Sequence, residues 1–191
     1  IMNKDTTVFE GSIFKGIDKI VSKDTLRPVM GFAYIDKGHI VATDAMHLVK
    51  VDLKFYGLDD EAIELLEGKC IDKDTLQKLG AMKSSQKYCI TEQGFCLLND
   101  KFKASVIYPI ELMSENGNYP NYEQVIPASI KEVSYTSLSP KLLLNVDNVF
   151  EGSVRSMSRL KMNFHGDMRA VTLTSECGQF LGLVMPRKVS F

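Results

Sequence analysis

One order of elements recurs three times along this sequence: a short strand, a helix, and then three strands joined by tight turns. The predicted helices start near residues 12, 72 and 139, so the repeat is roughly 60 to 67 residues long. Strands joined by short turns form antiparallel meanders, and helices that interrupt them pack on one face of the sheets. The fold class is therefore predicted to be α+β.

The first copy has its strongest signal in a helix that opens near Ser12. Five apolar side chains in that stretch fall on one face at helical spacing; they are Ile13, Phe14, Ile17, Ile20 and Val21. Arg27-Pro28 ends the stretch because proline restricts the residue before it. Strands are predicted at residues 7–9, 29–35, 40–43 and 48–53.

The second and third copies carry clear helix starts. Asp72 is a good N-cap for a helix that runs through Leu79, and Ser139-Pro140 combines a capping hydroxyl with proline at the first helical position. A polar linker at 114–124 separates the two copies, and an acidic stretch at 59–67, with room for a short helix, separates the first two. Strands are predicted at 69–71, 88–91, 95–98 and 102–108 in the second copy, and at 133–135, 160–164, 171–174 and 180–184 in the third.

Composition excludes several classes of protein. The chain of 191 residues has a formal charge of -1, which argues against coating nucleic acid by bulk charge but allows a local basic face. No apolar run approaches the ~20 residues of a membrane helix, and residues 1–5 do not resemble a signal peptide. We therefore expect a cytoplasmic protein. The four cysteines lack metal-ligand spacing, so we expect unpaired thiols, most of them buried.

Catalytic chemistry has no support in the motifs. Ser12-x-x-Lys15 and Ser84-x-x-Lys87 match a serine–lysine nucleophile pattern, but the accompanying S-D-N and K-T-G elements are absent. No phosphate-binding loop, nucleophile elbow or zinc-helix motif is present, and the three histidines lack paired ligand spacing. We expect neither an enzyme nor a bound cofactor or metal.

Three local stretches are more specific than the repeat. Residues 41–48 read Val-Ala-Thr-Asp-Ala-Met-His-Leu, residues 118–127 contain Tyr-Pro-Asn-Tyr-Glu-Gln-Val-Ile-Pro, and residues 183–189 begin Leu-Val-Met-Pro. In order and spacing they resemble the bacterial sliding clamp family, the β subunit of DNA polymerase III, which carries ATDGHRLA-, FPDYRRVIP- and VMPMRL-type stretches. The resemblance implies a DNA-clamp-like fold, in which each domain contains two of the repeating units.

The resemblance also predicts the organisation of the chain. Residues 8–127 correspond to a complete clamp-like domain of two units, and residues 130–191 correspond to the second half of another domain. The family's chain has six units in three domains and closes a ring from two chains, so four copies of this three-unit chain contain the same number of units.

In that family, partner proteins dock short peptides into an apolar pocket walled by the three stretches. Apart from one Thr, the matching positions here are apolar, and apart from the adaptable Met they are mostly rigid; they are Thr43, Leu48, Pro120, Val125, Val184, Met185 and Pro186. The family's Gly-His-Arg is replaced by Ala45-Met46-His47, so peptide specificity differs. The alternative is that these residues form only the core of a domain junction.

The resemblance further implies duplex DNA against the helix faces. The matching basic residues are Lys15, Lys19, Lys23, Lys78 and Lys83, and lysine contacts to phosphates are non-specific and salt-dependent. The alternative is an ordinary solvated helix face.

The function predicted from these features is a sliding-clamp-like processivity protein of DNA replication, which encircles duplex DNA as a homo-oligomer and docks peptides of polymerase or other replication proteins. The alternative is a clamp-derived peptide-binding adaptor or decoy that does not close a ring.

Overall fold

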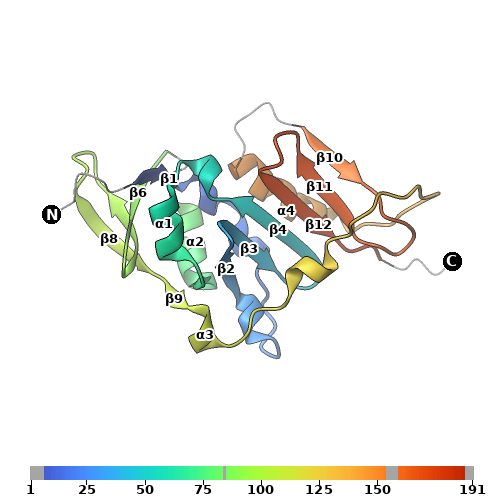
Figure 1. Cartoon of the computed structure of the whole chain (residues 1–191), viewed down its shortest axis with the longest axis horizontal. Helices are drawn as coiled ribbons and strands as arrows, with labels where there is room; N and C mark the ends of the chain where they lie inside the picture. Colours follow the sequence, from blue (N-terminus) through green and yellow to red (C-terminus); the bar gives the residue numbers. More distant parts are fainter. Residues whose placement is uncertain (1–6, 84, 154–158, 188–191) are drawn as a thin grey trace.

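The computed structural model describes residues 7–83, 85–153 and 159–187, arranged as two antiparallel sheets with helices packed against them (Figure 1). Ser84 of the second serine–lysine pattern lies outside these ranges. The smaller sheet has the strand order β1-β6-β7-β8, and the larger has the order β10-β11-β12-β4-β3-β2-β5-β9. The predicted α+β class is confirmed.

The small sheet consists of β1 (Val8–Glu10), β6 (Lys87–Thr91), β7 (Gly94–Leu98) and β8 (Ala104–Pro109). The large sheet consists of β2 (Phe32–Asp36), β3 (His39–Thr43), β4 (His47–Asp52), β5 (Lys69–Asp72), β9 (Glu111–Leu112), β10 (Leu160–Asn163), β11 (Val171–Ser175) and β12 (Phe180–Val184). The α-helices are α1 (Asp60–Leu66), α2 (Lys73–Ala81), α3 (Met113–Asn116) and α4 (Pro140–Ser153). Short 3₁₀ turns are η1 (Gly11–Phe14), η2 (Ile17–Lys19), η3 (Pro28–Gly31), η4 (Lys54–Tyr56) and η5 (Tyr122–Val125).

The recurring order defines three units: unit 1 from β1 to β4, unit 2 from β5 to β8, and unit 3 from residue 133 to the end of β12. Units 1 and 2 exchange their leading strands. β1 of unit 1 pairs with β6 of unit 2, where Phe9 lies opposite Tyr88. Conversely, β5 of unit 2 pairs with β2 of unit 1, where Ile71 lies opposite Ala33. The two units are thus joined twice by main-chain pairing.

Unit 3 joins the rest of the molecule through its last strand. β12 pairs antiparallel with β4 of unit 1, with Leu183 opposite Leu48 and Gly182 opposite Val49. This pairing makes one continuous eight-stranded sheet out of strands from all three units. The carboxy-terminal strand therefore lies beside residues more than a hundred positions earlier in the sequence.

The main core lies between the sheets and the helices. Helices α2 and α4 lie behind the sheets in Figure 1, whereas α1 and the yellow segment around η5 cross the front. A cluster of aromatic rings packs where units 1 and 2 meet: Phe14 and Phe95 meet edge to face with ring centroids 4.9 Å apart, and Phe9 and Tyr88 stack with centroids 5.9 Å apart. Burying such rings is the largest single apolar contribution that a side chain can make to a core.

Two predicted elements differ from the structure. The helix expected near Ser12 consists of the two 3₁₀ turns η1 and η2, interrupted at Gly16, whose φ of +74° is left-handed. A side chain there would also strike α4, since a Cβ at Gly16 would lie 3.1 Å from the Asn148 carbonyl carbon. All five apolar residues predicted to face the core are nevertheless buried.

The strand expected at residues 133–135 is absent. Among the described residues, the one ladder contact near this segment is a single parallel bridge between Lys131 and His165. Its β-branched and aromatic residues have the propensity for a strand, but no neighbouring strand is in place to pair with them. Residues 28–31 likewise form the turn η3 rather than the start of β2. The short helix expected in the acidic linker is α1.

Helix α4 can approach β12 closely because residue 182 is glycine. A Cβ at Gly182 would lie 2.4 Å from Val146 Cγ1, on a helix residue that is fully buried and β-branched, and so has little freedom to move aside. The contact between α4 and the sheet therefore depends on the missing side chain.

We expect Gly182→Ala to lower the free energy of unfolding by about 1–3 kcal/mol, the usual cost of overpacking a core. Gly31→Ala is the matched control, because its nearest neighbour would be 3.9 Å away and its φ is not left-handed. Urea unfolding followed by circular dichroism measures both variants. Equal stability of the two would show that α4 does not press on β12.

Candidate functional site

A second apolar cluster lies on the face of the large sheet opposite the main core. Leu48 of β4 and Leu183 of β12 form its centre as a directly opposed cross-strand pair, and both are buried. We call it the outer cluster; its buried members are Val41, Leu48, Tyr122, Ala170 and Leu183, and Tyr119, Ile126, Leu181 and Met185 pack around them half-buried. It lies where units 1 and 3 meet.

The segment 119–126 covers the outer cluster and is fastened to the sheet by its tyrosines. The Tyr122 hydroxyl donates a hydrogen bond of 2.7 Å to the Asp36 carboxylate, and Lys50 Nζ lies 5.7 Å from the centre of the same ring. The Tyr119 ring packs 5.0 Å from that of Tyr34. Burial, then the hydrogen bond to Asp36, raises the pKa of Tyr122, so this phenol stays protonated and keeps donating. The segment is thus held as a fixed wall.

The turn between β3 and β4 forms the second wall, and Asp44 organises it. One carboxylate oxygen of Asp44 accepts hydrogen bonds from the Met46 and His47 backbone amides at 2.8 and 2.9 Å and from His47 Nδ1 at 2.7 Å. His47 Nε2 lies 3.2 Å from the Asn145 side-chain amide of α4, which fits a histidine that donates from Nδ1 and accepts at Nε2. Ala45 has a φ of +72° at the position where the clamp stretch has glycine.

The carboxy-terminal stretch forms the third wall. The Met185 amide donates to the Met46 carbonyl oxygen at 2.9 Å, so the chain after β12 runs beside the β3–β4 turn. Beyond it, Pro186 and Met168 help to line a hollow of about 210 Å³. Residues 188 and 189 of the stretch lie outside the described part of the chain.

Exposed apolar side chains surround the outer cluster. Val125 is 52% exposed, Met168 54% and Met46 41%, although each adjoins one of the three walls. Pro120 and Pro186 are half-buried. An apolar rim over a rigid floor is typical of a surface that binds another chain rather than of a sealed core.

The predicted pocket residues divide into three groups. Thr43 and Leu48 are buried, and the Thr43 hydroxyl donates to the His47 carbonyl oxygen, so these two form the floor. Pro120, Val125, Met185 and Pro186 lie in the walls or on the rim. Val184 belongs to neither, because it points to the opposite face and is fully buried in the main core.

Leu183, and not the predicted Val184, lies on the outer face beside Leu48. Successive residues of a strand point to opposite faces, and along β12 Leu181, Leu183 and Met185 share the outer face whereas Phe180 and Val184 face the main core. This period-two pattern was present in the sequence and could have identified Leu183. The roles of Tyr119 and Tyr122 as clamps on the sheet had no such signal.

The predicted basic face lies on the helices behind the sheets. Lys19, Lys23, Lys78 and Lys83 are exposed. Lys15 is not free, because its Nζ donates to the Gly80 carbonyl oxygen at 2.6 Å and also to that of Met82, at the C-terminal end of α2. It therefore offsets the negative end of that helix. Asp18 lies between Lys15 and Lys19 along a groove of about 300 Å³ next to α4, so the positive charge is interrupted.

The described residues meet the requirements of neither a metal site nor a membrane-spanning helix. There, no three His, Cys, Asp or Glu side chains gather as metal ligands would. The same residues include no helix of the length and apolar character needed to cross a membrane. Cys70, Cys89 and Cys96 are buried free thiols and Cys177 is exposed, as expected for unpaired cysteines.

Solved structures resemble the whole of this arrangement. A β sliding clamp of C. crescentus superposes with a TM-score of 0.65 over 99% of this chain and 68% of the clamp, at 13% identity. The DNA polymerase sliding clamp of Bacillus subtilis superposes with a TM-score of 0.64 over 100% of this chain and 66% of the clamp, at 14% identity. The chain has the bacterial sliding-clamp fold.

This chain and the solved clamps share a fold although their sequences have little in common. A Helicobacter pylori β clamp solved with a DNA ligase peptide also superposes, with a TM-score of 0.53 over 99% of this chain and 68% of that clamp, at 12% identity. No protein-family model and no curated protein matches the sequence. The chain spans about two thirds of the length of these clamps.

Asp44 makes the β3–β4 turn of this clamp fold sensitive to acid. Burial by itself raises the pKa of Asp44, but the hydrogen bonds from His47 and Met46 outweigh it and hold the pKa below the ordinary value of 3.8. A group whose pKa is lowered by folding stabilises the protein above its unfolded pKa, and the stabilisation disappears as the pH falls through the folded value.

We therefore expect Asp44→Asn to lower the free energy of unfolding by about 1–3 kcal/mol near pH 7, with the difference from wild type shrinking below about pH 4. Asp100→Asn, in the exposed β7–β8 turn, serves as the control and leaves stability nearly unchanged. Urea titrations at several pH values measure the two curves. A deficit that stays constant down to pH 3 would contradict a role for the ionised carboxylate.

Proposed function

We propose that this chain is a sliding-clamp-like processivity protein of cytoplasmic DNA replication, which encircles duplex DNA as an oligomer and docks partner peptides on the apolar surface around the outer cluster, the candidate cleft. The observation that carries the proposal is the meeting of the three clamp-like stretches. Although the first and last of them lie more than 130 positions apart in the sequence, they converge as floor, walls and rim of one apolar surface. A junction core alone does not require Met46 and Val125 to be exposed.

The chemistry of the cleft fits a peptide with apolar anchors. Its floor is Leu48 and Leu183, and Met46, Met168 and Met185 near its margin can repack around side chains of different shape. Burying two apolar anchors stabilises a complex by roughly 3–6 kcal/mol before ordering costs. The Helicobacter pylori clamp solved with a ligase peptide shows that a protein of this fold binds a peptide.

The helix face supports a weaker, sequence-independent contact with duplex DNA. Lys19, Lys78 and Lys83 are exposed on or beside the elements that lie behind the sheets. Because the chain carries a formal charge of -1, DNA contact rests on this local arrangement and weakens steeply as salt rises. We divide the chain into a two-unit domain at 8–127 and a half-domain at 130–191, so four chains supply the twelve units expected for a ring.

A second candidate is a peptide-binding adaptor that does not close around DNA. The observation in its favour is the weakness of the basic face, where Lys15 is engaged at the end of α2 and Asp18 lies in the groove. Peptide binding is common to the two candidates, whereas retention on DNA belongs to the first alone.

For the cleft, we expect Val125→Asp to weaken peptide binding at least tenfold, because it places a charge on the apolar rim. The probe is a labelled peptide with a glutamine followed by spaced Leu and Phe, for which we expect a Kd near the micromolar range, or about -8 kcal/mol. Fluorescence anisotropy measures the affinity.

Val106→Asp is the matched control, since Val106 is 48% exposed on β8, in the small sheet away from the outer cluster. It should leave peptide affinity unchanged. Equal affinity of Val125→Asp and wild type would mean that the outer cluster is only a junction core.

For DNA, we expect Lys19→Glu/Lys78→Glu/Lys83→Glu to abolish retention of the protein on nicked circular duplex at low salt. The control exchanges Lys37, Lys54 and Lys101 for Glu; the first two pair with Glu123 and Asp60 on the front side, and the third lies in the β7–β8 turn. Gel-filtration of protein with circular DNA, at two salt concentrations, provides the measurement. Retention lost equally in both variants would indicate a net-charge effect, and retention by neither wild type nor variant would favour the adaptor.

A further inference from the structure

The junction between units 1 and 2 shows how two units of this fold join within a domain. Each unit adds its leading strand to the free edge of the other's meander: β1 lies against β6, and β5 lies against β2. The exchange is reinforced across β1 and β6 by an ion pair between Lys87 and Glu10 at 2.9 Å. Both units therefore need the same two features, an edge strand and a leading segment.

Unit 3 has both features, and among the described residues no further unit exchanges them. Within that part of the chain its edge strand β10 pairs with β11 alone and ends the eight-stranded sheet. Its leading segment, residues 133–138, leads into α4 without forming a strand. The link from Pro127 of the preceding wall to Val133 is short, so no fourth unit intervenes at this point of the chain.

The leading segment of unit 3 contacts the chain that follows its own unit, as the leading strand β5 of unit 2 does. In unit 2 the chain after β8 returns as β9 and pairs with the leading strand β5. In unit 3 the chain after β12 returns in the same way, and the Arg187 amide donates to the Ser137 carbonyl oxygen at 2.8 Å. One side of the segment is thus held by its own tail. Among the described residues, 132–136 make no backbone hydrogen bond on the other side.

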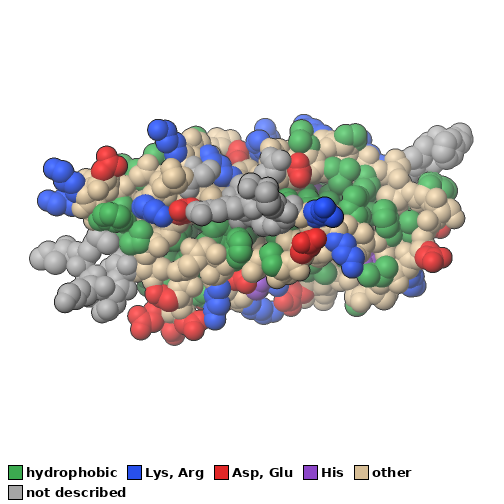
Figure 2. Space-filling view, turned by 90° about the horizontal axis from the view of Figure 1, so that it is seen from above, with side chains coloured by type: hydrophobic (Ala, Val, Ile, Leu, Met, Phe, Trp, Pro, Cys, Tyr) green, Lys and Arg blue, Asp and Glu red, His purple; other side chains and the backbone are tan. Residues whose placement is uncertain are grey.

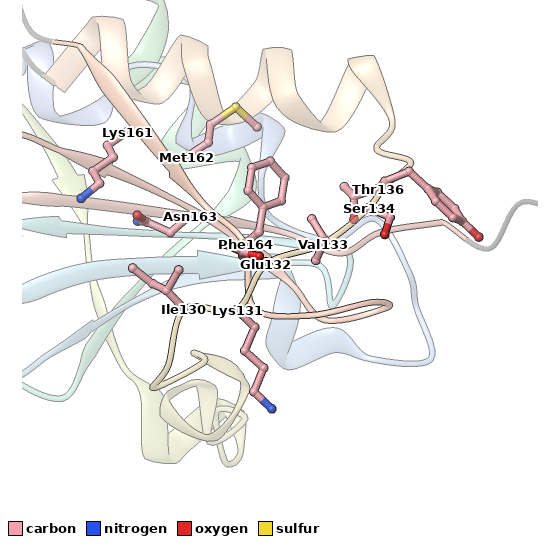
Figure 3. A pocket seen from close by; sticks show the side chains of 11 residues that line it. Ile130, Lys131, Glu132, Val133, Ser134, Thr136, Lys161, Met162, Asn163 and Phe164 are labelled. Atoms are coloured by element: carbon pink, nitrogen blue, oxygen red, sulfur yellow. The ribbon is translucent and has the colours of Figure 1, made fainter.

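A groove of about 650 Å³ separates the leading segment from β10. Figure 3 shows Met162 and Phe164 pointing to the side of helix α4, and Lys161 and Asn163 pointing away from it. Met162 lies opposite the buried Leu173 and so belongs to the core face, yet it is 42% exposed. Figure 2 shows apolar side chains gathered over the end of the molecule that carries β10.

We propose that this groove is the contact surface for unit 3 of a second copy of the chain, related by a two-fold axis. Each copy then offers its β10 edge to the leading segment of the other, as units 1 and 2 do within the chain. A two-fold contact is self-complementary, so one surface suffices for both partners. The groove also carries charges of both signs, Lys131 and Lys161 against Glu132, so facing copies can pair them.

A second copy fits this surface better than an unrelated strand does. An added peptide strand would cover β10 alone, but the leading segment would then stay unpaired and its Tyr135, 71% exposed, would remain in water. Only a unit of the same kind satisfies both features at once. This contact goes beyond the proposed function because it names the surface through which copies of the chain associate. It rests on the proposed function only in the statement that the associated copies form a ring.

The test is the mass of the protein in solution, measured by sedimentation equilibrium over a range of micromolar concentrations. We expect wild type to associate by pairs, and Met162→Asp to halve the mass, because it buries a charge at the centre of the contact. Met162→Lys should do the same, so the effect does not depend on the sign of the charge.

Two controls make the result specific. Leu112→Asp changes a residue that is 46% exposed on β9, at the opposite edge of the same eight-stranded sheet, and Val106→Asp changes one that is 48% exposed on β8, at the edge of the small sheet; both should keep the pairwise contact. A wild type that stays monomeric, or an oligomer that survives both Met162 variants, would overturn the proposal. Peptide affinity measured on the Met162 variants is unaffected either way, so failure of this contact and failure of the proposed cleft are distinguishable.

Discussion

The antiparallel pairing of β12 with β4 is the interaction on which the rest of this structure depends. It joins unit 3 to unit 1 by main-chain hydrogen bonds, which no single side chain controls. Its inner face presents Gly182 and Val184, where α4 docks to complete the main core. Its outer face presents Leu183 beside Leu48, the floor of the outer cluster. One strand pairing therefore supplies both the core of the half-domain and the candidate cleft.

Side chains alternate between the two faces of β12, so those on one face stabilise the core and those on the other belong to the proposed binding surface. Val184 is fully buried against the helix side, so its substitution acts through folding. Leu183 and Met185 share the other face with Tyr122, and there the cover is a segment fastened by hydrogen bonds rather than by a helix. A cover of this kind leaves an apolar rim, because a 3₁₀ turn and two prolines cannot shield a surface as wide as the one a helix covers.

Electrostatics in this chain serve local structure more than a long-range field. Lys15 is held by the carbonyl end of α2, Asp44 holds the β3–β4 turn, and Lys37 pairs with Glu123 of the wall. The Lys37–Glu123 pair has no net charge at a distance, and Lys15, although still positive, is held at α2 and is not free to approach a phosphate. The part of the helix face that remains for DNA is accordingly small, which makes salt the most informative variable for that contact.

The sequence by itself determined the order of elements and the burial of their apolar faces, because those follow from periodicity, capping and turn residues within short windows. The limits of β12, the start of α4 at Pro140 and the cap at Asp72 all agree with the structure. Local pattern could not reveal that Gly16 breaks the first helix into two turns, since the reason is the approach of α4 from far along the chain. Nor could it reveal that the described residues 133–135 form no strand, that Lys15 is engaged, or that Leu183 rather than Val184 lies on the outer face beside Leu48. Each of these depends on which strand or helix end lies next to which, and only the tertiary structure decides that.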